Sequence, residues 1–185
     1  MKGYVAKFAP LALLFLAPLA HAQQAPAGAS AQPCLSRSQI TAATTPATMM
    51  AALPRCVQEN RMEDAVDMFN IAGIFAYFDR QRVVDETAHG AYEAMKMQAV
   101  IAMGDELTKR FEASMKYQSA PERMPAYIAQ MCTFSKRVGP PTYEPTYMLA
   151  HGMSAFIDRP GGLVPGFDPA QGWQTTLTKY LKCPA

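Results

Sequence analysis

The sequence predicts an all-α protein, a single-domain bundle of about five helices with two disulfides. Apolar residues recur at the three- and four-residue spacings of helices along most of the chain after residue 45. No stretch alternates apolar and polar residues over the length of a strand. The four cysteines are an even number in a chain that begins with an export signal, which is typical of disulfide-bonded proteins.

Residues 1–22 have the pattern of a secretory signal peptide. Lys2 and Lys7 supply the positive start, residues 11–19 the apolar run, and residues 20–22 (Ala-His-Ala) the small-x-small cleavage pattern. The apolar run is too short for a bilayer span, which needs roughly 20 residues. We therefore expect a periplasmic or secreted protein that has no membrane span after the signal is cleaved.

The rest of the chain divides into a flexible leader over residues 23–33 and a helical domain over residues 34–185. The leader contains no large apolar side chain, which is typical of a segment that cannot pack. Loss of Lys2 and Lys7 with the signal reduces 17 basic residues to 15, against 15 acidic ones. This balance excludes a basic protein that binds nucleic acid through its net charge, and it excludes a membrane-surface protein with a polybasic face.

The cysteines allow three pairings, of which we favour Cys34–Cys56 and Cys132–Cys183. The first would tie the irregular N-terminal segment to the first firm helix, and the second would fasten the C-terminal end to an interior helix. No two cysteines have the close spacing of a zinc site or of a Cys-x-x-Cys redox pair.

The helical spacings place a short helix over residues 46–52 and longer ones over residues 60–78, 85–117, 121–138, 145–157 and 169–182. The helix that starts near Asn60 is apolar nearly all round, which predicts a central, buried position. Gly73 in its middle suggests a close helix–helix approach, and Gly104 is expected to bend or interrupt the next helix.

Catalytic and metal-binding patterns are sparse. The mature chain has two histidines and no G-x-S-x-G elbow. Glu86 and His89 match the Glu-x-x-His motif, which is one half of a di-iron carboxylate site. The second half is missing, because the residue three positions before His151 is Met148 and not a glutamate. The candidate metal ligands are therefore Glu86, His89 and His151, and no cofactor is predicted. The many methionines are better interpreted as core residues than as copper ligands.

Two connecting segments carry the candidate protein-binding residues. In the first, Asp79, Arg82 and Asp85 form a dense polar cluster, with Asp85 a plausible helix N-cap. In the second, Tyr143 and Tyr147 lie among prolines, which suits a protein-binding surface. The alternative interpretations are a capped turn with local salt bridges and tyrosines folded over the end of the bundle. Phe167, at the tip of a Gly/Pro-rich loop, is a third candidate.

The leading functional hypothesis is an exported protein-binding module. One specific form is an inhibitor or immunity-type protein that occludes a toxin or a cell-wall enzyme in the periplasm. The sequence favours binding over catalysis, although it does not decide whether the protein is an enzyme. One alternative is a metal- or haem-binding bundle that uses Glu86, His89, His151 and methionines. Another is a helical hydrolase with a site around Glu86, His89 and His151.

Overall fold

The computed structural model of the 185-residue chain describes residues 32–157 and 161–184. The predicted signal peptide and residues 23–31 of the predicted leader lie outside the described residues. Within the described ranges the fold is all-α, as predicted, and five of its helices have seven residues or more. The one pairing between extended segments in these ranges is the isolated antiparallel bridge between Val83 and Leu163.

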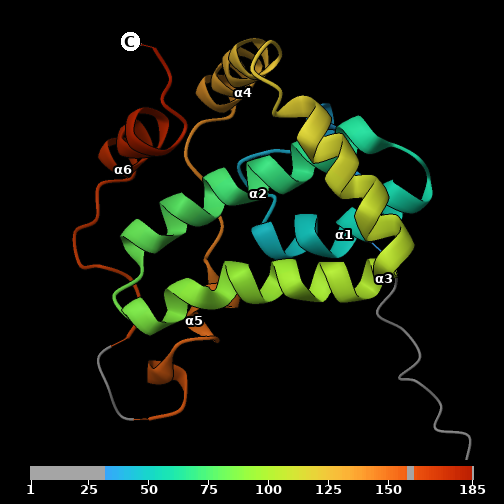
Figure 1. Cartoon of the computed structure of the whole chain (residues 1–185). Helices are drawn as coiled ribbons and strands as arrows, with labels where there is room; N and C mark the ends of the chain where they lie inside the picture. The colour runs from blue at the N-terminus through green and yellow to red at the C-terminus, as the bar shows by residue number, and fades with distance from the viewer. Residues whose placement is uncertain (1–31, 158–160, 185) are drawn as a thin grey trace, which may run out of the picture.

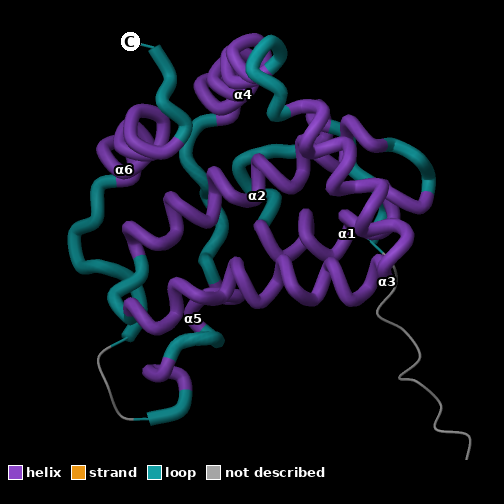
Figure 2. The backbone as a smooth tube through the Cα atoms, viewed as in Figure 1, coloured by secondary structure: helices purple, strands orange, loops and turns teal. Residues whose placement is uncertain are grey.

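Six α-helices follow one another along the described chain, joined by loops and short turns (Figure 2). Their bounds are α1 Pro46–Gln58, α2 Met62–Arg82, α3 Ala91–Gln118, α4 Met124–Val138, α5 Thr146–Leu149 and α6 Pro169–Thr175. Three 3₁₀ turns and one π turn complete them: η1 Arg37–Gln39, η2 Glu86–Gly90, η3 Met153–Ala155 and the π turn η4 Thr176–Tyr180.

Helix α2 is the centre of the fold. It runs through the middle of the molecule, with α1 and the first half of α3 on one side and α4 and α6 on the other (Figure 1). Ile71, Phe75 and Phe78 are fully buried, which confirms the prediction of a central helix. Gly73 leaves room for side chains rather than for another helix, because a Cβ there would lie 2.8 Å from the Tyr180 hydroxyl and 3.3 Å from the Tyr92 hydroxyl.

Helix α3 bends at Gly104, as the sequence predicts. The backbone there has φ 68° and ψ 176°, a conformation that glycine adopts without steric cost. Beyond the bend, Phe111 packs edge-on against Phe69 of α2, with ring centroids 5.5 Å apart. The bend therefore lets the second half of α3 cover the N-terminal half of α2.

Some helix boundaries differ from the prediction. The helix predicted over residues 145–157 is wrong, because only α5 forms and Met153–Ala155 is a separate 3₁₀ turn. The backbone N–H groups of Met153 and Ser154 bond to side chains of the 85–87 segment instead of to a preceding helical turn. Helix α1 in turn continues past residue 52 to Gln58, where Cys56 and Val57 are buried.

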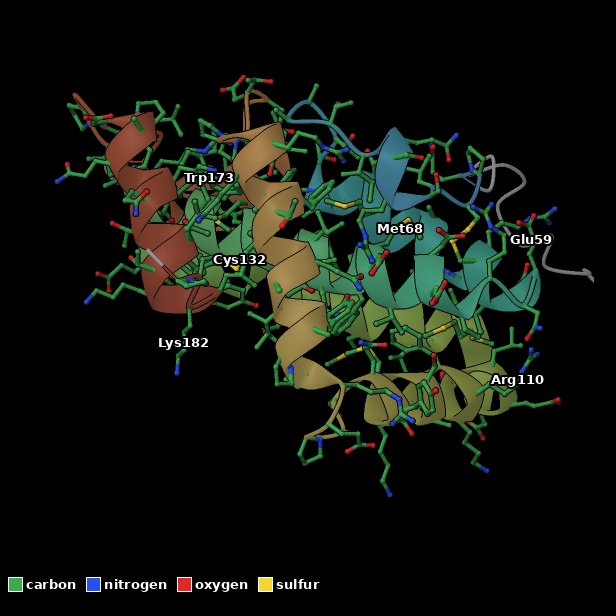
Figure 3. The ribbon with its side chains drawn as sticks, turned by 90° about the horizontal axis from the view of Figure 1, so that it is seen from above. Glu59, Met68, Arg110, Cys132, Trp173 and Lys182 are labelled. Atoms are coloured by element: carbon green, nitrogen blue, oxygen red, sulfur yellow. A yellow bond between two sulfur atoms is a disulfide. The ribbon has the colours of Figure 1, made fainter. Side chains whose placement is uncertain are left out.

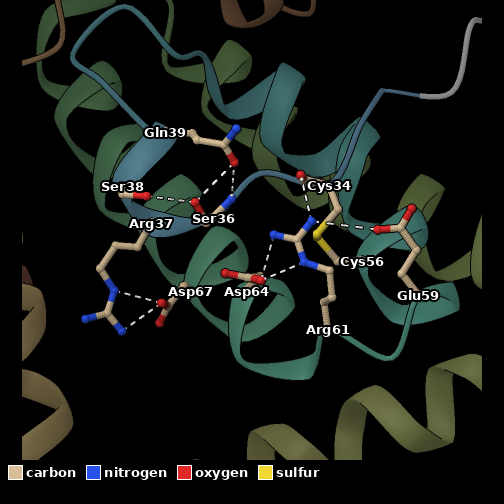
Figure 4. Close-up of polar contacts among 10 residues, drawn as sticks. All are labelled: Cys34, Ser36, Arg37, Ser38, Gln39, Cys56, Glu59, Arg61, Asp64 and Asp67. Atoms are coloured by element: carbon tan, nitrogen blue, oxygen red, sulfur yellow. Dashed lines mark hydrogen bonds and ion pairs between the residues drawn. A yellow bond between two sulfur atoms is a disulfide. The ribbon is translucent and has the colours of Figure 1, made fainter.

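Both predicted disulfides are confirmed, with Cα–Cα distances of 4.8 Å for Cys34–Cys56 and 5.6 Å for Cys132–Cys183. The second joins the C-terminal segment to α4, which carries the labelled Cys132 in Figure 3. The first joins the N-terminal segment to α1, beside the ion pairs that η1 and the start of α2 form (Figure 4). Among those pairs, Arg37 Nε donates to the buried Asp67 carboxylate at 2.7 Å.

Candidate functional site

The last turn of α2 holds a buried ion pair between Asp79 and Arg82. The two residues are three positions apart, so their side chains share one helix face. Arg82 Nη2 and Nε donate to Asp79 Oδ1 at 2.7 and 2.9 Å. Asp79 has no exposed surface and Arg82 is 8% exposed. The positive charge at the C-terminal end of the helix also complements the helix dipole.

Two tyrosines complete this site, and we call Asp79, Arg82, Tyr143 and Tyr147 the Asp79 cluster. The hydroxyls of Tyr143 and Tyr147 donate to Asp79 Oδ2 at 2.9 and 2.7 Å. Arg82 Nη2 also donates to the Tyr143 carbonyl at 2.8 Å, and its guanidinium lies 5.2 Å from the Tyr143 ring centroid. The cluster therefore fastens residues 143–147, which include the start of α5, to the end of α2.

The electrostatics of the cluster keep its hydroxyls protonated. Burial raises the pKa of Tyr143 and Tyr147, and the negative charge of Asp79 raises both further. Burial also raises the pKa of Asp79, an effect that the Arg82 charge and the hydrogen bonds from the tyrosines and Arg82 oppose. The carboxylate is enclosed and all four donors come from the protein, so this arrangement holds segments together rather than presenting an acid or base to a substrate.

A second polar anchor lies a few residues further along the chain. Asp85 caps η2 by accepting from the Thr87 amide at 2.9 Å, which confirms the N-cap prediction. Its other oxygen accepts from the Ser154 amide at 2.8 Å, and the Thr87 hydroxyl accepts from the Met153 amide at 2.8 Å. The hydrogen bond from the Thr87 hydroxyl has the largest effect in lowering the pKa of Asp85, and the bond from the Ser154 amide lowers this pKa further.

The predicted binding residues thus come together, but mostly inside the fold. Asp79 and Arg82 are buried, and Tyr143, Tyr147, Phe167 and Asp85 are half-buried. The Phe167 ring packs edge-on against Phe78, with centroids 5.5 Å apart. The structure therefore fits the two alternative interpretations, a capped turn with local ion pairs and tyrosines folded over the bundle, rather than an exposed recognition surface at these positions.

The candidate metal ligands do not assemble. Glu86 and His151 are exposed, and His89 Nε2 lies 3.2 Å from the Val83 carbonyl oxygen. In the described part of the chain, no three His, Cys, Asp or Glu side chains are close enough together to hold a metal ion. The described residues therefore offer no carboxylate–imidazole site of the kind that Glu86 and His89 suggested.

A surface that the sequence does not predict lies beside the second anchor, and we call it the apolar loop surface. It consists of exposed large apolar side chains from the segments on both sides of residues 158–160 and from the chain that follows α2: Val84, Met153, Phe156, Ile157, Leu163 and Val164. Phe156 is 75% exposed. Val84 N donates to the Gly162 carbonyl at 3.0 Å, and Val164 N donates to the Arg82 carbonyl at 2.8 Å. Backbone bonds and the Asp85 anchor thus hold both flanks against residues 82–87.

Comparisons of the chain with protein-family models, with curated proteins and with solved structures find no match. The two disulfides fit a protein that matures outside the reducing cytosol. None of the helices between residues 32 and 184 has the length and hydrophobicity of a bilayer span.

Proposed function

We propose that the protein is an exported protein-binding module whose recognition surface is the apolar loop surface. The observation that carries this proposal is the group of six large apolar side chains left exposed at Val84 and at residues 153–157 and 163–164. Contiguous exposed apolar side chains on a folded domain mark interaction sites, because leaving them in water forfeits roughly 25 cal/mol for each Å² that a partner would cover.

The way the loop is held supports recognition of a partner. Asp85 and Thr87 fix the Met153–Ser154 backbone, and the Val84 amide fixes the Gly162 end. A surface ordered before binding loses less conformational entropy when the partner arrives. Phe156 supplies an exposed aromatic ring, and aromatic residues are enriched at protein interfaces.

Exposed apolar side chains that include an aromatic ring suit binding in a concave site of a partner. The specific form we propose is an inhibitor or immunity-type protein that occludes a toxin or a cell-wall enzyme outside the cytoplasm. The enclosed Asp79 carboxylate and its saturated hydrogen bonds favour this function over catalysis. Export by the signal pattern of residues 1–22 belongs to the same proposal.

The test compares the mature protein with two variants as bait in periplasmic extract of the source cells. Phe156→Ser/Ile157→Ser removes the apolar loop contacts, and Tyr117→Ser is the matched control because Tyr117 is 61% exposed on another part of the molecule. We expect one protein to bind the wild type and the control, and purified components to bind the loop variant at least tenfold more weakly.

Three outcomes contradict the proposal: the absence of any captured protein at physiological salt, equal binding by all three baits, and binding to phospholipid vesicles alone. Retention of the far-ultraviolet circular dichroism spectrum and of the thermal midpoint shows that the variants are folded, so that a loss of binding reports on the surface.

A further inference from the structure

A groove between η1 and α4 is lined by two arginines and, among the described residues, by no acidic side chain. Its volume is about 390 Å³, within the range of roughly 300–1,000 Å³ that is typical of small-ligand sites. Positions 130, 133, 134 and 137 follow the three- and four-residue spacing of one helix face. The lining residues are Arg37 of η1 and Ala129, Gln130, Thr133, Phe134 and Arg137 of α4.

Arg37 is held in place and still has hydrogen-bond donors for a ligand. Its Nε and Nη2 both lie 2.7 Å from Asp67 Oδ2, and its Nη1 donates to Gln130 Oε1 at 3.1 Å. Figure 4 shows the third nitrogen of the guanidinium pointing away from Asp67. A guanidinium carries five N–H donors, so these three contacts leave two donors. Asp67 lies on α2 and does not line the groove.

Gln130 and Arg137 add further donors. Because Gln130 Oε1 accepts from Arg37, its amide has an NH₂ group for which the described residues supply no acceptor. The Arg137 guanidinium lies 5.8 Å from the Phe134 ring centroid, and no carboxylate of the described residues forms an ion pair with it. Asp67 balances the charge of Arg37, so Arg137 gives the groove a net positive charge.

We propose that this groove binds a small aliphatic dicarboxylate, with one carboxylate at Arg37 and Gln130 and the other at Arg137. Carboxylate oxygens only accept hydrogen bonds, and the two oxygens of one carboxylate match the fork of a guanidinium. Gln130 and Arg137 are seven positions apart, about 10 Å along α4, so the two ends of the groove suit two separate carboxylates. Phe134 lies between them and supplies an apolar surface for the methylene groups that join the carboxylates.

The groove shares no residue with the apolar loop surface. A dicarboxylate can therefore bind here whether or not a protein partner binds there, and the two proposals succeed or fail independently.

Isothermal titration calorimetry with adipate, acetate and inorganic phosphate tests the site, at constant ionic strength because salt screens exposed charges. We expect adipate to bind at least tenfold more tightly than acetate, and Arg137→Gln to weaken adipate binding at least tenfold. Arg80→Gln is the matched control, because it also removes an exposed arginine from the last turn of a helix, and it should bind adipate like the wild type.

Four results overturn the proposal. The first is the absence of adipate binding up to about 10 mM. The second is acetate binding as tightly as adipate, which would mean that only one carboxylate is recognised. The third is tighter binding of phosphate than of adipate, and the fourth is equal weakening by Arg137→Gln and Arg80→Gln.

Gln130→Glu tests the geometry with a variant that should keep its fold. A glutamate still accepts from Arg37, but it replaces the amide donors with a negative charge. We expect adipate binding to be lost at neutral pH while the thermal midpoint is kept. Gln98→Glu, an exposed glutamine on α3, makes the same change of charge outside the groove and should bind adipate normally. Full binding by Gln130→Glu, or equal loss in both variants, overturns the proposal.

Discussion

Replacing Asp79 by alanine should destabilise the protein by about 4 kcal/mol, because removal of one member of a buried ion pair typically costs 3–5 kcal/mol. Arg82, at 8% exposure, would keep the Tyr143 carbonyl as its one hydrogen-bond acceptor among the described residues. The hydroxyls of Tyr143 and Tyr147 would both lose their acceptor. Such a loss is a large part of the 5–15 kcal/mol by which ordinary domains are stable.

Urea unfolding at neutral pH, with the disulfides intact, measures this loss. Trp173, the one tryptophan of the chain, is a built-in reporter, because it is buried with its ring centroid 5.9 Å from that of Phe75 and 5.8 Å from that of Phe78. The control is Glu122→Ala, which breaks an exposed ion pair to Arg123 of the same 2.7 Å length. That change should stay within about 1 kcal/mol.

A companion variant separates the burial of an unpaired charge from the loss of the pair itself. Asp79→Leu/Arg82→Met removes both charges, so it should be clearly less destabilising than Asp79→Ala. The reasoning is refuted if Asp79→Ala costs less than about 1 kcal/mol, the range of an exposed pair. It is also refuted if the double variant is as unstable as the single one, because the cost would then not arise from an orphaned guanidinium.

Three further predictions concern the anchors of the same end of the bundle. Gly152→Ala should cost about 1–3 kcal/mol, because its Cβ would lie 2.8 Å from that of Ala88, whereas Gly90→Ala, whose nearest contact is 3.7 Å, should be neutral in the same urea assay. Because the pKa of Asp85 is lowered in the folded protein, the stabilisation that its carboxylate provides is complete above the unfolded pKa near 3.9 and is lost at lower pH. Protection of the Ser154 amide in hydrogen exchange should therefore fall as the pH drops below about 4. Asp85→Asn should abolish this pH dependence. Because burial raises the pKa of Tyr143 above 10, the folded state should lose stability as the pH rises past about 10. Absorbance at 295 nm should show the Tyr143 hydroxyl ionising only when the protein unfolds. Ionisation of every tyrosine in one step with the fold intact would contradict this prediction.

The features that the sequence predicted correctly depend on local patterns. Helical spacing identified the buried α2, a glycine marked the bend of α3, and an aspartate before Glu86 marked the cap of η2. Each of these is determined within a few residues, where steric and hydrogen-bonding preferences act directly. The disulfide pairing followed from the need to fasten two chain ends to interior helices.

The features that the sequence did not predict depend on partners far along the chain. Asp79 receives hydrogen bonds from residues 64 and 68 positions away, so no local pattern shows that the polar cluster and the tyrosines satisfy one another. The same limit explains the helix wrongly predicted over residues 145–157, where the Asp85 and Thr87 side chains compete for backbone groups. Apolar spacing likewise locates a helix face without showing whether the fold covers it, which is why Met97 and Ile101 were not recognised as exposed.

The polar anchors and the apolar loop surface are two parts of one arrangement. Residues 79–87 hold the 143–147 segment through Asp79 and Arg82, and they hold the backbone at residues 153–154 and 162–164 through Asp85, Thr87 and main-chain bonds. Because backbone and polar groups carry out this anchoring, the apolar side chains of the loop are not needed for it and stay free for a partner. Flanking segments that packed their own apolar residues to hold their shape would have buried Phe156, whereas here polar and backbone bonds hold residues 153–154 and 162–164 and the ring is 75% exposed.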